Sequence, residues 1–384
     1  MGIGRAHATQ LSLGVRSTRH RPWPLVVRRA RADDQQAVLG FATRTWNDWD
    51  YVPQAWPRWL DAPDGVLLVG VPGATGTGEP PLDAQGQALE VGRPIAIVRV
   101  ALVAPGEAWL EAIRVDPRVR GMDIATDLQV AELHWADAQR ASVVRYATSA
   151  RNEASHRLGA RGGFELLTTL RGHWWSATGD PEDDDRGESG FAPHVQAAAT
   201  ARRARLLDRL AGNGLVAAIG EGGSVWAALA GDPGFRAAAG MYEPRPWALE
   251  ELTRSKFERH LRRGEVIRLT TGEGRASAIL VRQQPPAEDA ALRVAVLSGD
   301  GSDALALVEK VRGLAGESIR FRVAADASPV SGHETAFREA GYVFPEWALH
   351  ILWRALDAGH PAPPVDPAAL VLGDAPEQVL VPPD

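Results

Sequence analysis

The stretch that decides the fold is Leu110–Ala136, LEAIRVDPRVRGMDIATDLQVAELHWA. Its first residues are mostly apolar, as in a buried strand, and Pro117 ends that strand. A basic turn with Arg118, Arg120 and Gly121 follows. The apolar residues after the turn recur at helical spacing, namely Ile124, Leu128, Ala131 and Trp135. The stretch therefore predicts a strand, a turn and an amphipathic helix, and the N–H groups that begin such a helix can bind an anion.

The composition sets limits on the class of protein. A chain of 384 residues suits two domains, and 45% hydrophobic with 23% charged residues is ordinary for a globular protein. The net charge of -6 gives no reason to expect nucleic-acid or membrane binding. The absence of cysteine excludes a thiol nucleophile and cysteine-ligated metals. We expect a cytoplasmic protein without a membrane-spanning helix, a secretory signal or a metal site.

The first half of the chain predicts one mixed domain. Residues 24–178 read as strands first, then strand, helix, strand, helix and strand, which is typical of an α/β domain with a mixed sheet. Residues 1–23 are basic and are predicted to form a flexible arm. Residues 179–192 are acidic and are predicted to form a solvated linker.

The second half predicts the same order of elements over residues 193–356. Gly341-Tyr342 follows a short helix there, just as Gly163-Phe164 does in the first half. The two halves are therefore predicted to be a diverged internal repeat. Residues 357–384 are rich in proline and are predicted to form an extended tail.

A set of residues in the first half carries a family resemblance. The set is Val115-Asp116-Pro117, Arg120-Gly121, Ile124-Ala125, Asn152, Leu158 and Gly163-Phe164. In type and spacing it resembles the motif of the GNAT (GCN5-related N-acetyltransferase) family, most strongly over residues 94–177. The resemblance implies two tandem GNAT-like domains of α/β class, of which the second is degenerate.

The resemblance also implies acetyl-CoA as cosubstrate. Its pyrophosphate would lie on the Arg118–Thr126 turn, and its pantetheine arm along the Ile113–Val115 strand, with Asn152 contacting that arm. The implied cofactor-binding residues are Ile113, Arg114, Val115, Arg118, Arg120, Gly121, Met122, Asp123, Ile124, Ala125, Thr126 and Asn152. An amine would attack the thioester directly in a splay between strands, so no enzyme nucleophile is needed.

Two residues depart from the family pattern. The family has glycine where this chain has Asp123, which we expect to cap the following helix with its carboxylate and compete with the pyrophosphate. Arg118 and Arg120 would compensate for that charge. Gly159 stands where the family often has a tyrosine that acts as general acid, and Tyr146 or a water molecule would substitute for it.

The family places a catalytic glutamate on the strand that holds Glu107 and Glu111. Both are candidates for the general base, and Glu111 is nearer the splay. The alternative is that they are solvent-facing strand residues.

The acceptor pocket is predicted in the tryptophan-rich segment before the second strand. Trp46, Trp49 and Tyr51 would wall it, and Asp48 and Asp50 would attract a cationic amine. The alternative is that these aromatic residues fill the core.

The sequence thus predicts an N-acetyltransferase that acetylates a primary amine of a small molecule, such as an aminoglycoside-like, polyamine or amino-acid-derived compound. A role like that of mycothiol synthase is one case. The second half has no arginine and two aspartates in the corresponding turn, residues 298–304, so the first half is expected to be active. The alternatives are a non-catalytic acyl-CoA sensor and a protein lysine or N-terminal acetyltransferase. The chain would be a monomer, that is, a pseudo-dimer of two domains, or a homodimer.

Overall fold

The computed structural model groups the chain into two compact units, each of which is discontinuous along the sequence. It describes residues 21–43, 45, 50–176, 206–245, 248–271, 274–281, 292–318, 322–329, 331–346, 348–356 and 370–372. Unit 1 takes the described residues of 1–146, 154–165 and 353–384, and unit 2 takes those of 147–153 and 166–352. The predicted linker, residues 179–192, lies outside the described residues, so the predicted domain boundaries remain predictions.

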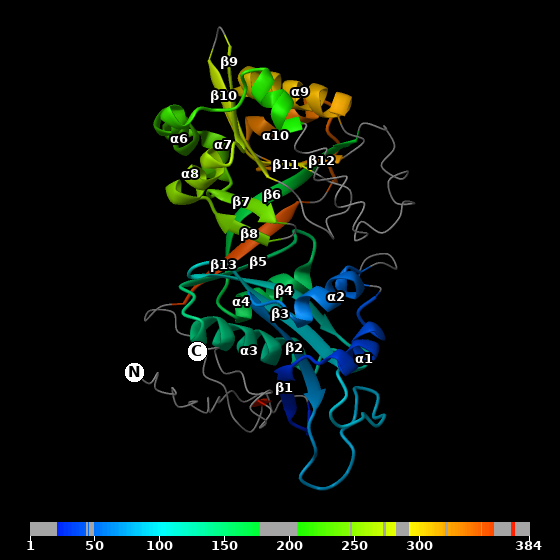
Figure 1. Cartoon of the computed structure of the whole chain (residues 1–384). Coiled ribbons are helices and arrows are strands. Elements are labelled where there is room, and N and C mark those ends of the chain that lie inside the picture. Colours follow the sequence, from blue (N-terminus) through cyan, green and yellow to red (C-terminus); the bar gives the residue numbers. More distant parts are fainter. Residues whose placement is uncertain are drawn as a thin grey trace, which may run out of the picture. The chain divides into compact units, whose positions relative to one another are not determined.

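Unit 1 is built around a mixed sheet (Figure 1). The elements that lie wholly or partly in it are β1 (Leu25–Arg29), η1 (Ala32–Asp34), α1 (Gln35–Leu39), α2 (Val52–Leu60), β2 (Gly65–Pro72), β3 (Ala96–Ala104), β4 (Glu107–Val115), η2 (Pro117–Val119), α3 (Ile124–Ala138), β5 (Val143–Ser149), α4 (Glu153–Arg161) and β14 (Leu370–Leu372). The strand order is β14-β1-β2-β3-β4-β5. Strands β1 to β4 pair antiparallel, whereas β5 pairs parallel with β4 after the α3 crossover.

Helices cover both faces of this sheet. Leu67, Val69 and Val71 of β2 share a core with Trp56 and other residues of α1 and α2. The residues between them in β2 point the opposite way, because side chains alternate along a strand. On that opposite face β2 packs closely against α3, because a Cβ placed on Gly70 would lie 3.5 Å from Leu128 of α3. Burial on both faces explains the continuous apolar run of β2.

Unit 2 contains a second mixed sheet. Its elements are β6 (Glu165–Ser176), η4 (Ile219–Glu221), α6 (Gly222–Gly231), α7 (Pro233–Ala237), β7 (Met241–Arg245), β8 (Ala248–Glu251), α8 (Arg254–Arg262), β9 (Val266–Thr270), β10 (Arg275–Val281), β11 (Leu292–Ser298), α9 (Gly301–Ser318), β12 (Arg322–Ala327), α10 (Gly332–Glu339) and β13 (Leu349–Ala355). The strand order is β6-β12-β11-β10-β9, and β7 and β8 form a separate hairpin.

The two sheets share a pattern of pairing. In unit 2, β9, β10 and β11 pair antiparallel, and β12 then pairs parallel with β11 after helix α9. In unit 1, β2, β3 and β4 pair antiparallel, and β5 pairs parallel with β4 after helix α3. This agreement in order and in pairing sense is what the predicted internal repeat requires.

The structure adds local detail to the predicted fold. Strand β6 runs unbroken over Glu165–Ser176. Within the predicted extended tail, Leu370–Leu372 pairs parallel with β1, whose outer edge would otherwise lack main-chain partners. At the end of the predicted flexible arm, Arg21 and Trp23 are buried. Within the described ranges, no helix combines the length and apolar character that crossing a membrane requires.

Candidate active site

Strand β4 is bent in its middle. Ala112 has φ 63°, which is uncommon for a residue other than glycine. Glu111 lies opposite Arg99 of β3, and Arg114 lies opposite Ile97. Between these two pairs, β4 therefore contains one more residue than β3. This is a β-bulge, and it redirects the end of the strand.

The end of β4 also separates from β5. The two strands pair only from Glu107–Trp109 to Val143–Arg145, although β4 continues to Val115. Among the described residues, no strand pairs with Ile113–Val115 on that side. The edge can therefore accept an extended chain through main-chain hydrogen bonds.

A tight turn joins β4 to α3. Its start is fixed by Asp116, which accepts a hydrogen bond from the Arg118 N–H at 2.9 Å and from the guanidinium of the same residue at 2.7 Å. These hydrogen bonds hold the pKa of Asp116 below its ordinary value, although burial opposes the shift. Arg120 is exposed beside the turn, and Gly121 has φ 81° with open space around its Cβ position.

Asp123 occupies the predicted cap position of α3 but does not act as predicted. Its carboxylate makes no capping hydrogen bond, and one carboxylate oxygen lies 3.6 Å from Arg161. The reason is its left-handed backbone, φ 58°, because a capping side chain normally starts from an extended residue. This conformation suits the glycine of the family motif, and aspartate is among the few other residues that tolerate it. The predicted competition for the first-turn N–H groups is therefore absent.

Few side chains contribute polar groups to the first turn of α3. Met122 and Ile124 are buried, so they can present only main-chain groups there. Thr126 has a buried hydroxyl oxygen without a hydrogen-bond partner among the described residues. A buried hydroxyl without a partner is costly, which marks this position as one that a ligand would satisfy.

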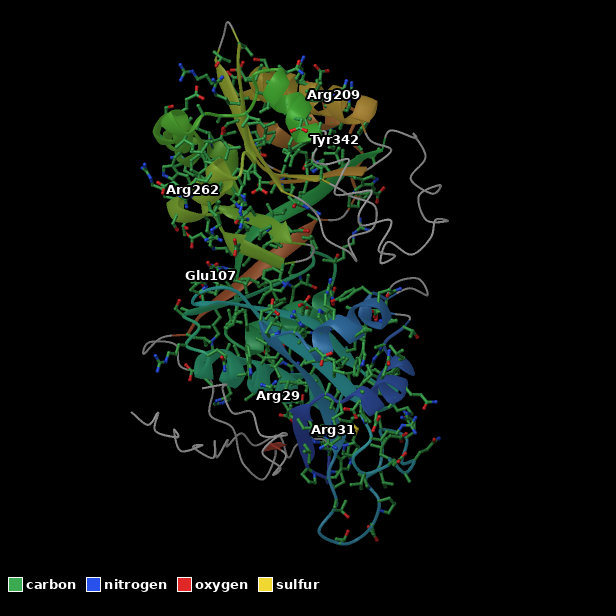
Figure 2. All side chains as sticks on the ribbon, viewed as in Figure 1. Arg29, Arg31, Glu107, Arg209, Arg262 and Tyr342 are labelled. Atoms are coloured by element: carbon green, nitrogen blue, oxygen red, sulfur yellow. The ribbon has the colours of Figure 1, made fainter. Side chains whose placement is uncertain are left out.

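The two candidate bases are held in ion pairs. Glu111 contacts Arg99, which also reaches Asp64 at 3.2 Å, and Glu107 lies 2.6 Å from Arg145. Both carboxylate side chains are 13% exposed, so the solvent-facing alternative does not describe them. Figure 2 shows Glu107 at the start of β4.

Tyr146 is poorly placed to act as the general acid. Its hydroxyl donates to the Ser155 carbonyl at 3.2 Å, and its ring packs edge-on against Phe164. Burial raises the pKa of Tyr146 to about 12. Gly159 is buried in α4.

In unit 2, Asn152 immediately precedes α4 and donates to the Thr148 hydroxyl at 3.1 Å.

The separation of β4 from β5 and the turn into α3 agree with what the resemblance implies. The mixed sheet of unit 1 agrees with the GNAT-like fold that the resemblance implies. Among solved structures, it is similar to a GCN5-related N-acetyltransferase from Sphaerobacter thermophilus, with 15% identity, 89% of this chain and 97% of that chain covered, and a TM-score of 0.46. For a GCN5-related N-acetyltransferase from Kribbella flavida, the values are 15%, 88%, 72% and 0.41.

A shorter similarity covers 38% of this chain. It is to a ribosomal-protein-alanine N-acetyltransferase from Brucella melitensis, with 19% identity, 88% of that chain covered and a TM-score of 0.30. No family model and no curated protein matches the chain. The chemistry therefore rests on the residues of this chain.

On the predicted acceptor side of unit 1, Asp50 does not have its predicted role. It is fully buried and pairs with both ends of the Arg114 guanidinium, at 2.7 and 3.2 Å. Its charge is thus neutralised and cannot attract an amine. Tyr51 packs edge-on against Trp59 beneath the same guanidinium, and burial raises the pKa of Tyr51 to about 12. Trp46, Asp48 and Trp49 lie outside the described residues.

The corresponding turn of unit 2 is closed by carboxylates. The Gly299 N–H donates to Asp232 at 2.9 Å, and the Asp303 N–H donates to Asp300 at 3.1 Å. Asp303 is itself buried and accepts a hydrogen bond from Thr271. The start of α9 therefore already has internal anions where α3 has open groups, which disfavours a second anion site.

Sequence reasoning missed one residue near the turn of unit 1. Arg21 donates to the Met122 carbonyl at 2.9 Å and pairs with Asp127, the acidic residue in the first turn of α3. These partners are 101 and 106 residues away along the chain, so no local pattern could have indicated them.

Proposed function

We propose that the chain is an acetyl-CoA-dependent N-acetyltransferase whose active site lies in unit 1. The observation that carries the proposal is the turn at Asp123, whose carboxylate is turned towards Arg161 and leaves the start of α3 open. The pyrophosphate of acetyl-CoA would accept hydrogen bonds from the first-turn N–H groups and the Thr126 hydroxyl. Arg118 and Arg120 would add positive charge at the rim.

The pantetheine arm would continue from this turn along the open edge of β4. Residues Ile113–Val115 lack a partner strand on the β5 side within the described part of the chain. The Ile113 carbonyl already accepts a hydrogen bond from the Arg114 side chain at 3.0 Å. The arm is therefore expected to depend on the other main-chain groups of this segment.

The reaction is a direct transfer. The amine nitrogen attacks the thioester carbonyl carbon, the carbon–sulfur bond breaks, CoA leaves as its thiolate, and the amine loses one proton. Because a thiol has a pKa of about 8.5, its thiolate leaves readily near neutral pH. Tyr146, with a pKa of about 12, would have to protonate a weaker base, so we propose that the thiolate leaves without its help.

Removal of the proton from the amine is the step that needs a base. Glu111 remains our proposed base, acting through a water molecule because Arg99 occupies one of its oxygens. The acceptor class is a small primary amine, and the ion pair of Asp50 with Arg114 means that Asp50 does not select it.

The test exploits the lack of cysteine. Because the chain has no thiol of its own, a thiol reagent detects only the CoA that turnover releases. We expect acetyl-CoA at 100 times its Kd to stabilise the protein by about 2.7 kcal/mol, and an amine panel to yield one free thiol per acetylated product. Absence of any stabilisation at saturating acetyl-CoA would contradict the proposal.

One specific observation supports a second candidate, a non-catalytic acyl-CoA-binding protein. Both candidate bases are ion-paired, and Gly159 offers no hydroxyl in place of the family's tyrosine. Binding of acetyl-CoA without thiol release across the amine panel would favour this candidate. Turnover that falls at least tenfold in Glu111→Gln, with acetyl-CoA affinity unchanged, would favour the enzyme.

A further inference from the structure

Arg21 is buried at the turn between β4 and α3, although it precedes β1 by four residues. Its side chain is 1% exposed. The guanidinium donates from Nη1 to the Met122 carbonyl at 2.9 Å and from Nε to the Trp23 carbonyl at 3.2 Å, and its Nη2 contacts the carboxylate of Asp127. All three nitrogen atoms of the guanidinium group therefore contact oxygen atoms of the protein.

These contacts hold the two ends of one short segment. The Met122 carbonyl comes immediately before Asp123, and Asp127 lies in the first turn of α3. Residues 122–127 are the part of the turn proposed to bind the pyrophosphate. A guanidinium is planar and rigid, so gripping both ends restricts the backbone between them.

The second effect concerns charge. Asp127 is 2% exposed, and its carboxylate belongs to the same helical turn that would receive an anion. An unpaired carboxylate at this depth would repel the pyrophosphate, because charges a few ångströms apart interact strongly away from bulk water. Arg21 supplies the opposite charge.

Arg21 is itself anchored by its neighbours. Its guanidinium lies 5.5 Å from the centre of the Trp23 ring, and Trp23 donates from its indole to the Leu82 carbonyl at 2.8 Å. Leu82 belongs to the loop between β2 and β3, and in the same loop the Ala84 N–H donates to the Arg118 carbonyl at 3.0 Å. The segment before β1 and this loop are thus both fastened to the turn.

We propose that Arg21 is a positioning residue for acetyl-CoA, which holds residues 122–127 in the anion-binding conformation and cancels the charge of Asp127. This inference rests on the proposed function, because it assumes that the turn binds the cofactor.

The test measures the Kd of acetyl-CoA by calorimetry for the wild type, Arg21→Ala, Asp127→Asn and the double variant. Arg21→Ala is expected to weaken binding about tenfold, because the turn loses the hydrogen bonds that hold it and Asp127 loses its counter-ion. Asp127→Asn leaves the charge of Arg21 without its counter-ion beside the anion site, so its affinity is expected to be unchanged or tighter. The double variant also lacks the carboxylate, so it is expected to recover the part of the lost affinity that is due to charge.

The matched control is Arg28→Ala. Arg28 pairs with Asp34 at 2.6 Å in an equally buried ion pair on β1 and η1, so its loss tests general destabilisation. We expect this variant to lose thermal stability and keep the wild-type Kd. In steady-state kinetics, Arg21→Ala should raise KM for acetyl-CoA and leave kcat nearly unchanged, since Arg21 does not reach the thioester.

Three outcomes would overturn the proposal. If Arg21→Ala binds acetyl-CoA as the wild type does, Arg21 is only structural, and the proposed function survives. If Asp127→Asn binds more weakly than the wild type, the charge argument is wrong, and this readout remains valid even if Arg21→Ala fails to fold. If the wild type binds no acetyl-CoA, the proposed function and this inference fail together.

Discussion

At the scale of single residues, Asp123 shows how backbone conformation can reverse a chemical expectation. By type and position it should cap α3, and its charge should then exclude a phosphate. With φ 58°, the carboxylate instead turns towards Arg161. The same side chain that argued against cofactor binding leaves the site open.

This account predicts the behaviour of two substitutions at position 123. Asp123→Gly should keep the acetyl-CoA Kd within about twofold and keep stability, because glycine suits a positive φ. Asp123→Ala should cost about 1 kcal/mol in unfolding free energy, because alanine is disfavoured in the left-handed region. Urea denaturation and calorimetry measure the two effects. A large gain in affinity for Asp123→Gly would mean that the carboxylate faces the ligand after all.

Glu132 carries a second residue-scale prediction. It is buried in α3, one of its oxygens has no partner among the described residues, and burial raises its pKa well above 4.5. A carboxyl with a raised folded-state pKa favours folding below its unfolded pKa, and this contribution is lost as pH rises. Glu132→Gln should therefore stabilise the protein at pH 7.5, and the gain should shrink towards pH 4.5.

Urea denaturation at the two pH values measures this effect. Glu90→Gln is the control, because Glu90 pairs with Arg93 in an exposed position and should change stability little at either pH. A Glu132→Gln variant that is no more stable than the wild type at pH 7.5 would show that the carboxyl has an unseen partner.

At the scale of elements, β4 decides the site. Its end just before Pro117 was predicted, because an apolar run before a proline is a local signal. The bulge at Ala112 was not predicted, because alanine carries no preference for a positive φ. The bulge depends instead on pairing with β3, which is not local in sequence.

The bulge predicts a contrast between two substitutions. Ala112→Gly should be tolerated, whereas Ala112→Val should cost at least about 1–2 kcal/mol and weaken acetyl-CoA binding, because a β-branched residue strongly disfavours positive φ. Ala108→Val is the control for crowding, since Ala108 is equally buried in the same strand. If both valine variants lose the same stability and affinity, the bulge conformation is not what shapes the edge.

The sequence predicts the local features of the fold but not the contacts between distant residues. The helix α3, the turn before it and the order of elements along the chain follow from periodicity and turn residues, which act over a few positions. The ion pairs that define the site, such as Arg99 with Glu111, Arg114 with Asp50 and Arg21 with Asp127, join residues brought together only by the sheet. Single residues gave no sign of these partners.

At the scale of the whole molecule, two similar sheets raise the question of how many cofactor sites exist. In unit 1, Arg118 and Arg120 are exposed at the turn, and the buried Thr126 hydroxyl has no hydrogen-bond partner among the described residues. The turn of unit 2 presents Asp300 and carboxylates that already accept its N–H groups. The two sheets share the pairing pattern, but in unit 2 internal carboxylates occupy the turn before α9.

We therefore expect calorimetry to find one acetyl-CoA bound per chain. Asp232→Ala should destabilise the protein by about 1–3 kcal/mol, because it leaves the Gly299 N–H without its acceptor and His333 without its carboxylate. It should leave the acetyl-CoA Kd unchanged, whereas Arg120→Ala should raise that Kd in a manner that weakens with added salt. Two equivalents bound by the wild type, or a Kd that changes in Asp232→Ala, would mean that unit 2 takes part in binding. The internal carboxylates of α9 would then have to yield to a phosphate, which their charge opposes.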